Sequence, residues 1–454
     1  MGRLFGTDGV RGRANADLTA ELALDVSVAA AHVLAETGEF GGHTPLAVVG
    51  RDPRASGEFL EAAVVAGLAS AGVNVVRLGV LPTPGVAYLT GFTGADLGVM
   101  LSASHNPMPD NGIKFFARGG AKLDDALEDA IEAHLGQSWA RPTGADVGRV
   151  REDLSLVESY VAHLVSSLDK PTSLEGLKVV VDCANGGAHL TGPAALQVQG
   201  AQVTAIHASP DGLNINDNCG STHPADLQAK VVSTGSDLGI ALDGDADRCL
   251  AVDASGTMVD GDQILAILAV AMRDSGQLRG NTVVGTVMSN LGFFHAMQSQ
   301  GIEVQQTRVG DRYVLEAMNA HNFSLGGEQS GHVVMAEHAT TGDGVLTALH
   351  LMNRMASTGA TLAELASVMT RMPQVLINVR DVDKARADTD PTLCAAVAEA
   401  SAELGEDGRV LLRPSGTESV VRVMVEAQTA EDARRIAERL AGVVKTSLGP
   451  LGNR

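Results

Sequence analysis

Leu46-Ala-Val-Val-Gly-Arg-Asp52 opens an apolar strand that a glycine- or asparagine-containing turn follows, and the chain repeats this pattern at 177–183 and 282–288. In each copy a helical stretch follows, and then a second strand that opens with glycine, at 72–76, 200–203 and 301–304. A third strand ends in a polar loop, at 97–104, 238–245 and 325–330. Alternating strands and helices predict parallel βαβ units with helices on both faces. The repeat therefore predicts three similar α/β domains with parallel or mixed sheets.

The polar loops of the three copies follow equivalent strands. Ligands of open α/β sheets bind beyond the carboxyl ends of the strands. We therefore expect these loops, which carry the most reactive side chains of the chain, to face one central cleft.

The C-terminal part of the chain has a different pattern. Strands are expected at 375–379, 410–413 and 420–425, and Thr429-Ala-Glu-Asp432 opens an amphipathic helix over 433–444. This order predicts a small α+β domain. The resulting domain boundaries are 1–155, 156–255, 256–370 and 371–454.

The composition excludes several classes of protein. A chain of 454 residues is too long for one hydrophobic core. With a net charge of −21 and 3% aromatic residues, it lacks the basic surface and stacking platforms that nucleic-acid binding needs. The apolar run 264–272 is shorter than the roughly 20 residues that span a bilayer, and Gly6, Asp8 and Arg11 interrupt any signal-peptide core. We expect a cytoplasmic protein with no nucleic-acid or membrane partner.

The four cysteines are scattered along the chain without the paired spacing of a zinc site. Reduced and mostly buried thiols are the expected state for Cys183, Cys219, Cys249 and Cys394.

The first reactive loop reads Leu-Ser-Ala-Ser-His-Asn-Pro over residues 101–107. It offers the hydroxyl of Ser104 beside His105, on a turn that Asn106-Pro107 interrupts. Lys114 and Arg11 are suitable cations for a dianion attached to that hydroxyl. Such a role needs an exposed hydroxyl, and Ser102 is the rival serine.

The second reactive loop, 243–248, reads Asp-Gly-Asp-Ala-Asp-Arg. Its carboxylates, Asp243, Asp245 and Asp247, can chelate Mg²⁺, with an oxygen of a phosphorylated Ser104 completing the shell. A calcium EF-hand is excluded because Arg248 stands where that loop needs glycine and Ala254 where it needs glutamate. Arg248 is expected to neutralise part of the site or to contact a substrate phosphate.

Two further loops suit a sugar phosphate. Glu328 and Ser330 offer an acceptor and a donor to vicinal sugar hydroxyls, with His332 nearby. In the C-terminal domain, Ser415, Gly416 and Thr417 supply successive backbone N–H groups to an anion, and Arg413 and Arg422 add positive charge. Residues 51–54 and 341–344 are equally turn-like, and no role is assigned to them.

Four of these segments, 104–107, 243–248, 327–332 and 413–418, together resemble the α-D-phosphohexomutase superfamily, in its order and over nearly the whole chain. The opening Phe5–Gly12 and Gln329 are similar to the branch that acts on glucosamine phosphates. The resemblance implies that Ser104 is the phosphoserine, that 327–332 is the sugar-binding loop, and that the four domains surround a cleft. It also implies Mg²⁺, a glucosamine 1,6-bisphosphate or glucose 1,6-bisphosphate intermediate, and a homodimer.

Sequence leaves several alternatives open. Lys114, Arg11 and His332 are all candidates for the general base or a proton relay. A mannose or glucose phosphate is the rival substrate for the same machinery, while a sugar phosphatase and a non-catalytic sugar-phosphate sensor are less expected functions.

Overall fold

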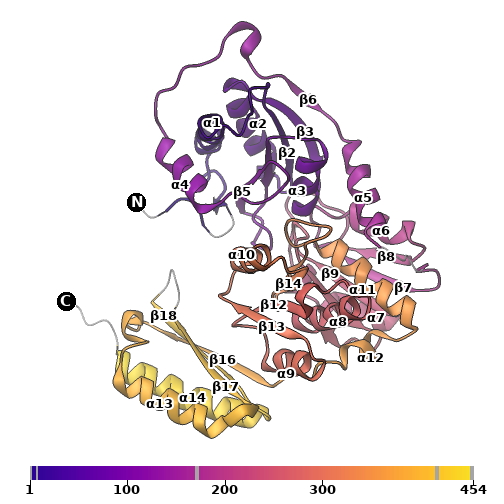
Figure 1. The fold of residues 1–454 in the computed structure, drawn as a ribbon, viewed down its shortest axis with the longest axis vertical. Helices are drawn as coiled ribbons and strands as arrows, with labels where there is room; N and C mark the ends of the chain where they lie inside the picture. Colours follow the sequence, from indigo (N-terminus) through magenta and orange to yellow (C-terminus); the bar gives the residue numbers. More distant parts are fainter. Residues whose placement is uncertain (1–2, 7–8, 169–172, 415–418, 450–454) are drawn as a thin grey trace. The chain divides into compact units, whose positions relative to one another are not determined.

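The computed structural model describes residues 3–6, 9–168, 173–414 and 419–449, and it divides into two compact units. The first unit comprises 1–288 with 302–368, and the second comprises 289–301 with 369–454. Three mixed sheets lie in the first unit, and one antiparallel sheet lies in the second (Figure 1). Three α/β domains and a C-terminal α+β domain are confirmed.

The first sheet has the strand order β1-β5-β4-β2-β3-β6. Its strands are β1 (Val10–Arg13), β2 (Leu46–Arg51), β3 (Asn74–Val80), β4 (Leu97–Leu101), β5 (Asp110–Ala117) and β6 (Val150–Glu152). Strands β4, β2, β3 and β6 form the parallel part, and β5 runs antiparallel to both of its neighbours, β4 and β1.

Successive residues of the parallel strands point to opposite faces of this sheet. Its helices are α1 (Ala20–Glu36), α2 (Ser56–Ser70), α3 (Thr83–Phe92) and α4 (Asp125–His134). Val49 and Val99 pack with α1 and α2 on one face, while Val48 and Met100 pack with α3 on the other. Because both faces are covered, β4 is wholly buried, and the loop that follows it stands on a rigid base.

The second sheet has the order β11-β10-β9-β7-β8 and follows helix α5 (Leu156–Ser166). Its elements are β7 (Lys178–Asp182), α6 (Thr191–Val198), β8 (Gln202–Ile206), α7 (Ala225–Thr234), β9 (Leu238–Leu242), β10 (Cys249–Asp253) and β11 (Met258–Val259). The Asp243–Arg248 loop joins buried β9 to antiparallel β10, so the sheet fixes both of its ends.

The third sheet has the order β13-β12-β14-β15. Its elements are α8 (Gly261–Asp274), β12 (Thr282–Thr286), β13 (Glu303–Thr307), α10 (Asp311–His321), β14 (Leu325–Gly327), β15 (Val333–Met335), α11 (Gly344–Thr358) and α12 (Leu362–Ala366). The expected sugar loop is the turn between β14 and antiparallel β15. Asp260 begins α8 with a capping box that it forms with Gln263.

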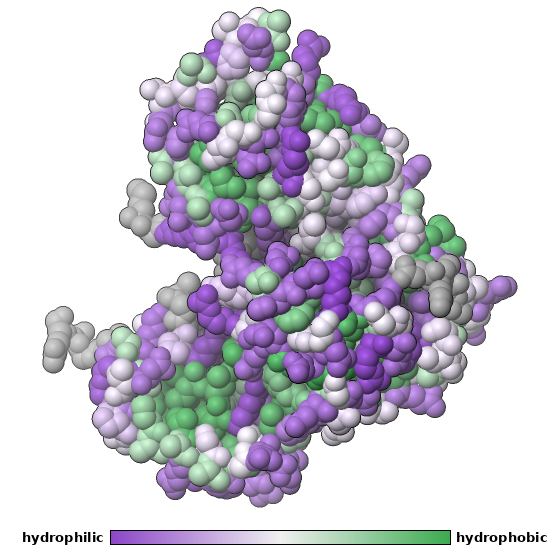
Figure 2. All heavy atoms as spheres, in the orientation of Figure 1, coloured by the Kyte–Doolittle hydropathy of each residue, from purple (hydrophilic) through white to green (hydrophobic). Residues whose placement is uncertain are grey.

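The second unit has an antiparallel sheet of order β16-β18-β17, formed by Gln374–Arg380, Val420–Glu426 and Arg409–Pro414 respectively. Helices α13 (Pro391–Leu404) and α14 (Ala430–Leu448) cover one face, and α9 (Leu291–Ser299) belongs to the same unit. Thr429 caps α14 as the sequence predicts. Figure 2 shows apolar residues gathered on the sheet, where Leu376 is 47% exposed.

Within the described residues, no helix combines the length and the apolar character that crossing a membrane requires. The four cysteines are free thiols; Cys394 is exposed and the other three are buried.

Candidate active site

The Ser104 loop and the aspartate loop meet directly, although more than a hundred residues separate them in the sequence. Ser104 Oγ donates a hydrogen bond of 2.5 Å to Asp243 Oδ2. The approach depends on Gly244, where a side-chain carbon would lie 2.5 Å from the Ser104 carbonyl oxygen. The glycine between the first two aspartates therefore lets one loop pack against the other.

The expectation of an exposed Ser104 hydroxyl is wrong for this structure, because the residue is only 1% exposed. The close contact with the aspartate loop covers it. A phosphoryl group on Oγ replaces the hydroxyl proton and so ends the hydrogen bond to Asp243.

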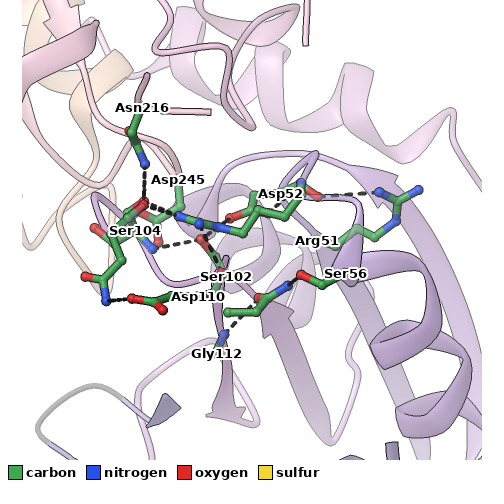
Figure 3. Close-up of polar contacts among 12 residues, drawn as sticks. Arg51, Asp52, Ser56, Ser102, Ser104, Asp110, Gly112, Asn216 and Asp245 are labelled. Atoms are coloured by element: carbon green, nitrogen blue, oxygen red, sulfur yellow. Dashed lines mark hydrogen bonds and ion pairs between the residues drawn. The ribbon is translucent and has the colours of Figure 1, made fainter. Parts of the chain in front are cut away.

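Ser104 has φ of +52°, in the left-handed region that non-glycine residues seldom adopt. Its backbone is held from both directions, because Ser102 Oγ accepts from the Ser104 N–H at 3.0 Å and Asn216 Nδ2 donates to the Ser104 carbonyl at 2.8 Å (Figure 3). Strain that surrounding contacts maintain is common at functional sites.

The rival serine, Ser102, has its hydroxyl committed elsewhere. Its Oγ donates to Asp52 Oδ2 at 2.6 Å and accepts the Ser104 N–H, so it bonds to the first domain alone (Figure 3). Of the two hydroxyls, only that of Ser104 lies on the aspartate cluster. This geometry favours Ser104 as the phosphoryl carrier.

The three aspartates form a candidate metal site. Ligand oxygens of Asp243, Asp245 and Asp247 lie within 4.8 Å of one another, and all three side chains are buried. Oδ1 of Asp245 and Oδ1 of Asp247 have no hydrogen-bond partner among the described residues. Buried carboxylates that repel each other and keep unused acceptor oxygens suit a hard divalent cation. The donor set therefore fits Mg²⁺.

The surroundings of this cluster raise the pKa of one aspartate and lower the pKa of another. Burial, followed by the charges of Asp247 and Asp245, raises the pKa of Asp243 well above its usual value. Burial also acts to raise the pKa of Asp247, but His332, Lys114 and Arg248 outweigh it and hold that pKa below its usual range.

Asp245 is positioned by the first domain. Thr83 Oγ1 donates to Asp245 Oδ2 at 2.5 Å from the start of α3, and Lys114 Nζ lies 2.8 Å from the same oxygen. Lys114, on β5, is 3% exposed and also lies 3.9 Å from Asp247. The structure thus brings Lys114, which the sequence singled out as a cation for Ser104, to the aspartate cluster, where it binds carboxylates.

His105 lies beside the Ser104 hydroxyl, with its Nδ1 3.3 Å from Ser104 Oγ. Burial, followed by the positive charges of Arg248 and Arg11, lowers the pKa of His105 to about 4. The ring is therefore neutral at physiological pH, and its Nδ1 can accept a hydrogen bond from Ser104 Oγ or donate one to it. Arg11 itself is exposed on β1, near enough to influence this ring.

His332 lies behind Asp247, with Nδ1 3.6 Å from Oδ2, and its Nε2 accepts the Gly342 N–H at 3.2 Å. Burial acts to lower its pKa, but the hydrogen bond and charge of Asp247 prevail and raise it. The ring is 3% exposed. This geometry favours a role in orienting Asp247.

Arg248 and the sugar loop adjoin the cluster. The backbone N–H of Arg248 donates to Asp243 Oδ1 at 3.2 Å, and Arg248 pairs with His332 in an isolated antiparallel β-bridge. Ser330 Oγ is buried and has no hydrogen-bond partner among the described residues, whereas Glu328 accepts the Gly310 N–H at 2.9 Å. Gln329, the residue that suggested an amino sugar, donates to Asp260 at 3.3 Å.

In the second unit, Arg413 and Arg422 are direct cross-strand partners on β17 and β18. Two like charges opposite each other are unfavourable unless an anion lies near them. Ser415, Gly416 and Thr417, the expected phosphate cradle, lie outside the described residues.

Sequence reasoning missed several residues that build the site. Thr83 and Asn216 gave no local signal, since their importance lies in contacts with other domains. Sequence reasoning assigned no role to residues 51–54 or 341–344; in the structure the first turn follows β2, whereas the second leads into α11. A charged turn at a strand's carboxyl end is the signal for 51–54, and an aspartate at a helix N-cap is the signal for 341–344.

Asp343 shows what the 341–344 turn does. Its Oδ1 accepts the N–H groups of Val345 and Leu346 and so caps α11, while Oδ2 accepts the hydroxyl of Tyr160 at 2.8 Å. Burial dominates over these bonds and raises the pKa of Asp343 to about 6.

Asp343→Asn is therefore expected to stabilise the protein relative to wild type more at pH 8 than at pH 5. The folded pKa of about 6 exceeds the usual 3.8, so the wild type loses stability as pH rises through that folded value. The full difference between the two pKa values corresponds to on the order of 3 kcal/mol, and roughly half of it lies between pH 5 and pH 8. Urea unfolding of both proteins at the two pH values measures the difference, and a pH-independent difference contradicts the assignment.

The fold and site define a multidomain α/β protein in which a serine hydroxyl lies on a buried cluster of three aspartates that fits a divalent metal. Models of the phosphoglucomutase/phosphomannomutase family match the chain as alpha/beta/alpha domain I at 2–140, domain II at 158–256, domain III at 260–372 and the C-terminal domain at 376–443. The chain therefore belongs to the phosphoglucomutase/phosphomannomutase family, and the predicted phosphohexomutase resemblance is confirmed.

Individual relatives agree with this assignment. The chain is 68% identical over 448 residues to a phosphoglucosamine mutase of a Nocardioides strain, with 99% of this chain and 100% of the relative covered. It is 69% identical over 454 residues to a phosphoglucosamine mutase of Streptomyces griseus, with the same coverage. A crystal structure of a phosphoglucomutase/phosphomannomutase family protein from Burkholderia thailandensis superposes with a TM-score of 0.79 at 26% identity, covering 98% of this chain and 97% of that one.

Proposed function

We propose that this chain is a phosphoglucosamine mutase, an isomerase that interconverts glucosamine 6-phosphate and glucosamine 1-phosphate and so supplies UDP-N-acetylglucosamine synthesis. The Nocardioides and Streptomyces relatives bear that name and align over nearly the whole chain. The structural observation that carries the proposal is the 2.5 Å hydrogen bond from Ser104 to Asp243. It places a serine able to hold a phosphoryl group on a buried carboxylate cluster.

The reaction consists of two transfers. The phosphoryl group on Ser104 passes to the sugar O1, so the Oγ–P bond breaks and an O1–P bond forms, giving glucosamine 1,6-bisphosphate. The bisphosphate then turns within the site and returns its other phosphoryl group to Ser104. In each transfer a proton leaves the accepting hydroxyl, and a proton is supplied to the oxygen that loses phosphorus.

The side chains around Ser104 support these steps. Lys114 and Arg11 supply positive charge to the transferring group, and neutral His105 can exchange a proton with Ser104 Oγ across 3.3 Å. Lys114, Arg11 and His332 remain the candidates for the base on the sugar hydroxyl. His332 and Lys114 are both 3% exposed and both contact aspartates of the cluster, so burial does not separate these two candidates.

Asp243, Asp245, Asp247 and an oxygen of phosphorylated Ser104 are the proposed holders of Mg²⁺. When bound, the ion supplies a Lewis acid that offsets the charge of the phosphoryl group. Arg248 and His332 keep the carboxylates Asp243 and Asp247 in place for it.

Glu328 and Ser330 are the proposed contacts of the sugar hydroxyls. The buried, unpartnered Ser330 hydroxyl is the stronger support, because a sugar hydroxyl can satisfy it. The substrate phosphate that does not react is assigned to Arg413, Arg422 and the 415–417 segment.

Arg413→Ala is expected to raise the KM for glucosamine 6-phosphate by about tenfold while kcat changes little, because the arginine binds the non-reacting phosphate in ground and transition states alike. Arg422→Ala should act in the same direction. Steady-state kinetics measures both. Arg435→Ala, which removes an exposed arginine paired with Glu403 on α14 and α13, is the matched control. Unchanged KM values in both strand variants contradict the phosphate assignment.

The function itself is tested by assaying glucosamine, glucose and mannose phosphates side by side. We expect the highest kcat/KM with the glucosamine phosphates. Faster turnover of glucose or mannose phosphate makes the chain a phosphoglucomutase or phosphomannomutase, and release of inorganic phosphate without isomerisation makes it a phosphatase.

Three predictions from the sequence complete this proposal. The domain boundaries are 1–155, 156–255, 256–370 and 371–454; the protein is cytoplasmic; and it forms a homodimer. Limited proteolysis and the mass in solution test the first and the last.

A further inference from the structure

Arg54 is a buried cation that none of the proposed steps uses. Its side chain is wholly buried, and it lies at the carboxyl end of β2, in the 51–54 turn. Burying a guanidinium is costly unless its donors are paired. The position of those donors shows what the residue holds.

All five N–H groups of the guanidinium have acceptors. Nε donates to Asp52 Oδ2 at 2.9 Å. The remaining bonds go to four backbone carbonyls of the Ser104 loop and the start of β5: those of Ser104 at 3.0 Å, Asn106 at 2.8 Å, Pro107 at 2.6 Å and Asp110 at 3.0 Å. The loop is thus wrapped around one planar cation.

Asp52 extends this contact to the other side of Ser104. Its Oδ2 accepts the Ser102 hydroxyl at 2.6 Å, and Ser102 in turn accepts the Ser104 N–H at 3.0 Å (Figure 3). Arg54 therefore fixes the carbonyl of Ser104, while its partner Asp52 fixes the amide through Ser102. Both peptide groups of the residue with φ of +52° are held by one ion pair.

The second domain uses the same carbonyls. Asn216 Nδ2 donates to the carbonyls of Ser104 at 2.8 Å and Asn106 at 3.1 Å, both of which Arg54 also contacts. The loop thus lies between a donor from each domain. Because Arg54 of the first domain and Asn216 of the second donate to the same carbonyls, these bonds set the position of Ser104 relative to the aspartate loop.

We propose that Arg54, supported by Asp52 and Ser102, is the positioning residue of phosphoryl transfer: it holds the Ser104 backbone in the conformation that points Oγ at the aspartate cluster. The inference rests on the proposed role of Ser104. Arg54 does not touch the reacting atoms. A lysine cannot replace it, because three donors on one ammonium cannot reach acceptors arranged around a planar fork.

The test is Arg54→Lys in the full-length protein, compared with wild type. We expect a folded protein whose kcat falls by about a hundredfold, since misplacing a reacting group by about 1 Å has that effect, while KM for glucosamine 6-phosphate changes less than about threefold. Transfer from glucose 1,6-bisphosphate to Ser104, followed by intact mass, should slow by the same factor. Mg²⁺ affinity from calorimetry should stay at the wild-type value.

Arg77→Lys is the matched control. Arg77 forms a two-pronged ion pair with Glu61 in the same domain, through Nε and Nη2 at 3.1 Å each, and it lies on β3. We expect this variant to keep the wild-type kcat and phosphorylation rate.

Two outcomes overturn the inference. One is an Arg54→Lys protein that is folded and keeps kcat within about threefold of wild type. The other is a kcat loss that vanishes once the unfolded fraction, measured by circular dichroism, is taken into account. If the wild-type protein itself is not phosphorylated on Ser104, the proposed function is wrong. This result is thereby distinguished from a failure of the Arg54 inference alone.

If Arg54→Lys does not fold, Ser102→Ala provides the second test. It breaks the link from Asp52 to the Ser104 amide and leaves the guanidinium in place. A kcat lower by about tenfold with KM unchanged supports the positioning network, and wild-type kcat overturns it.

Discussion

Ser104→Ala is expected to leave a folded protein whose mutase activity is at least about ten-thousandfold below wild type, because the covalent route through two transfers is lost. In barrier height this is on the order of 5 kcal/mol. Coupled assays of glucosamine 1-phosphate formation measure it, and circular dichroism checks the fold. In wild type, peptide mass spectrometry should place the phosphoryl group on Ser104.

Ser233→Ala, a change at an exposed serine near the end of α7, is the matched control and should retain full activity. Two results count against the assignment. One is an alanine variant that retains more than about a tenth of wild-type activity, which is a loss of only about 1.4 kcal/mol in barrier. The other is a phosphoryl group found on Ser102.

Removal of divalent metal is expected to stop turnover, and Mg²⁺ should restore it better than Ca²⁺. Three aspartates and a phosphoryl oxygen suit a small octahedral ion, whereas Ca²⁺ prefers more ligands at longer distances. Asp245→Asn should weaken Mg²⁺ binding in calorimetry and lower kcat by about a hundredfold or more, because the metal and its ligands stabilise the transferring charge.

The control for charge alone is Asp211→Asn, at an exposed aspartate of the second domain. It should bind Mg²⁺ and turn over as wild type does. Two results would contradict the metal role of the cluster. One is turnover that persists in excess EDTA after the metal has been removed, and the other is an Asp245→Asn protein with wild-type Mg²⁺ affinity.

The fold was largely readable from local patterns. Three repeats of an apolar strand, a helix and a glycine-led strand predicted three α/β domains. The first strand of each repeat became an inner strand, β2, β7 or β12, whereas the glycine-led β8 and β13 lie at sheet edges. In the C-terminal domain, Thr429 began the predicted helix, which extends to Leu448. These features depend on residues close in sequence, whose periodicity and capping chemistry are visible without a structure.

The site was readable only in part. The sequence singled out Ser104 and the three aspartates, but it expected an exposed hydroxyl, and the structure buries Ser104 against Asp243. The sequence offered Gln329 as a hint of an amino sugar but gave no sign that its amide bonds to Asp260. In both cases the neighbour comes from a distant segment, and local sequence carries no record of it.

The sequence by itself determined the family, the order of the domains and the chemical groups available at each strand end. The tertiary structure alone decided which groups meet: Thr83 and Lys114 on Asp245, Asn216 on the Ser104 carbonyl, and Arg54 at the centre of the Ser104 loop. The reason is physical. A strand or cap is stabilised by neighbours a few residues away, whereas the pairing of two loops depends on how sheets pack and on one glycine that permits close approach.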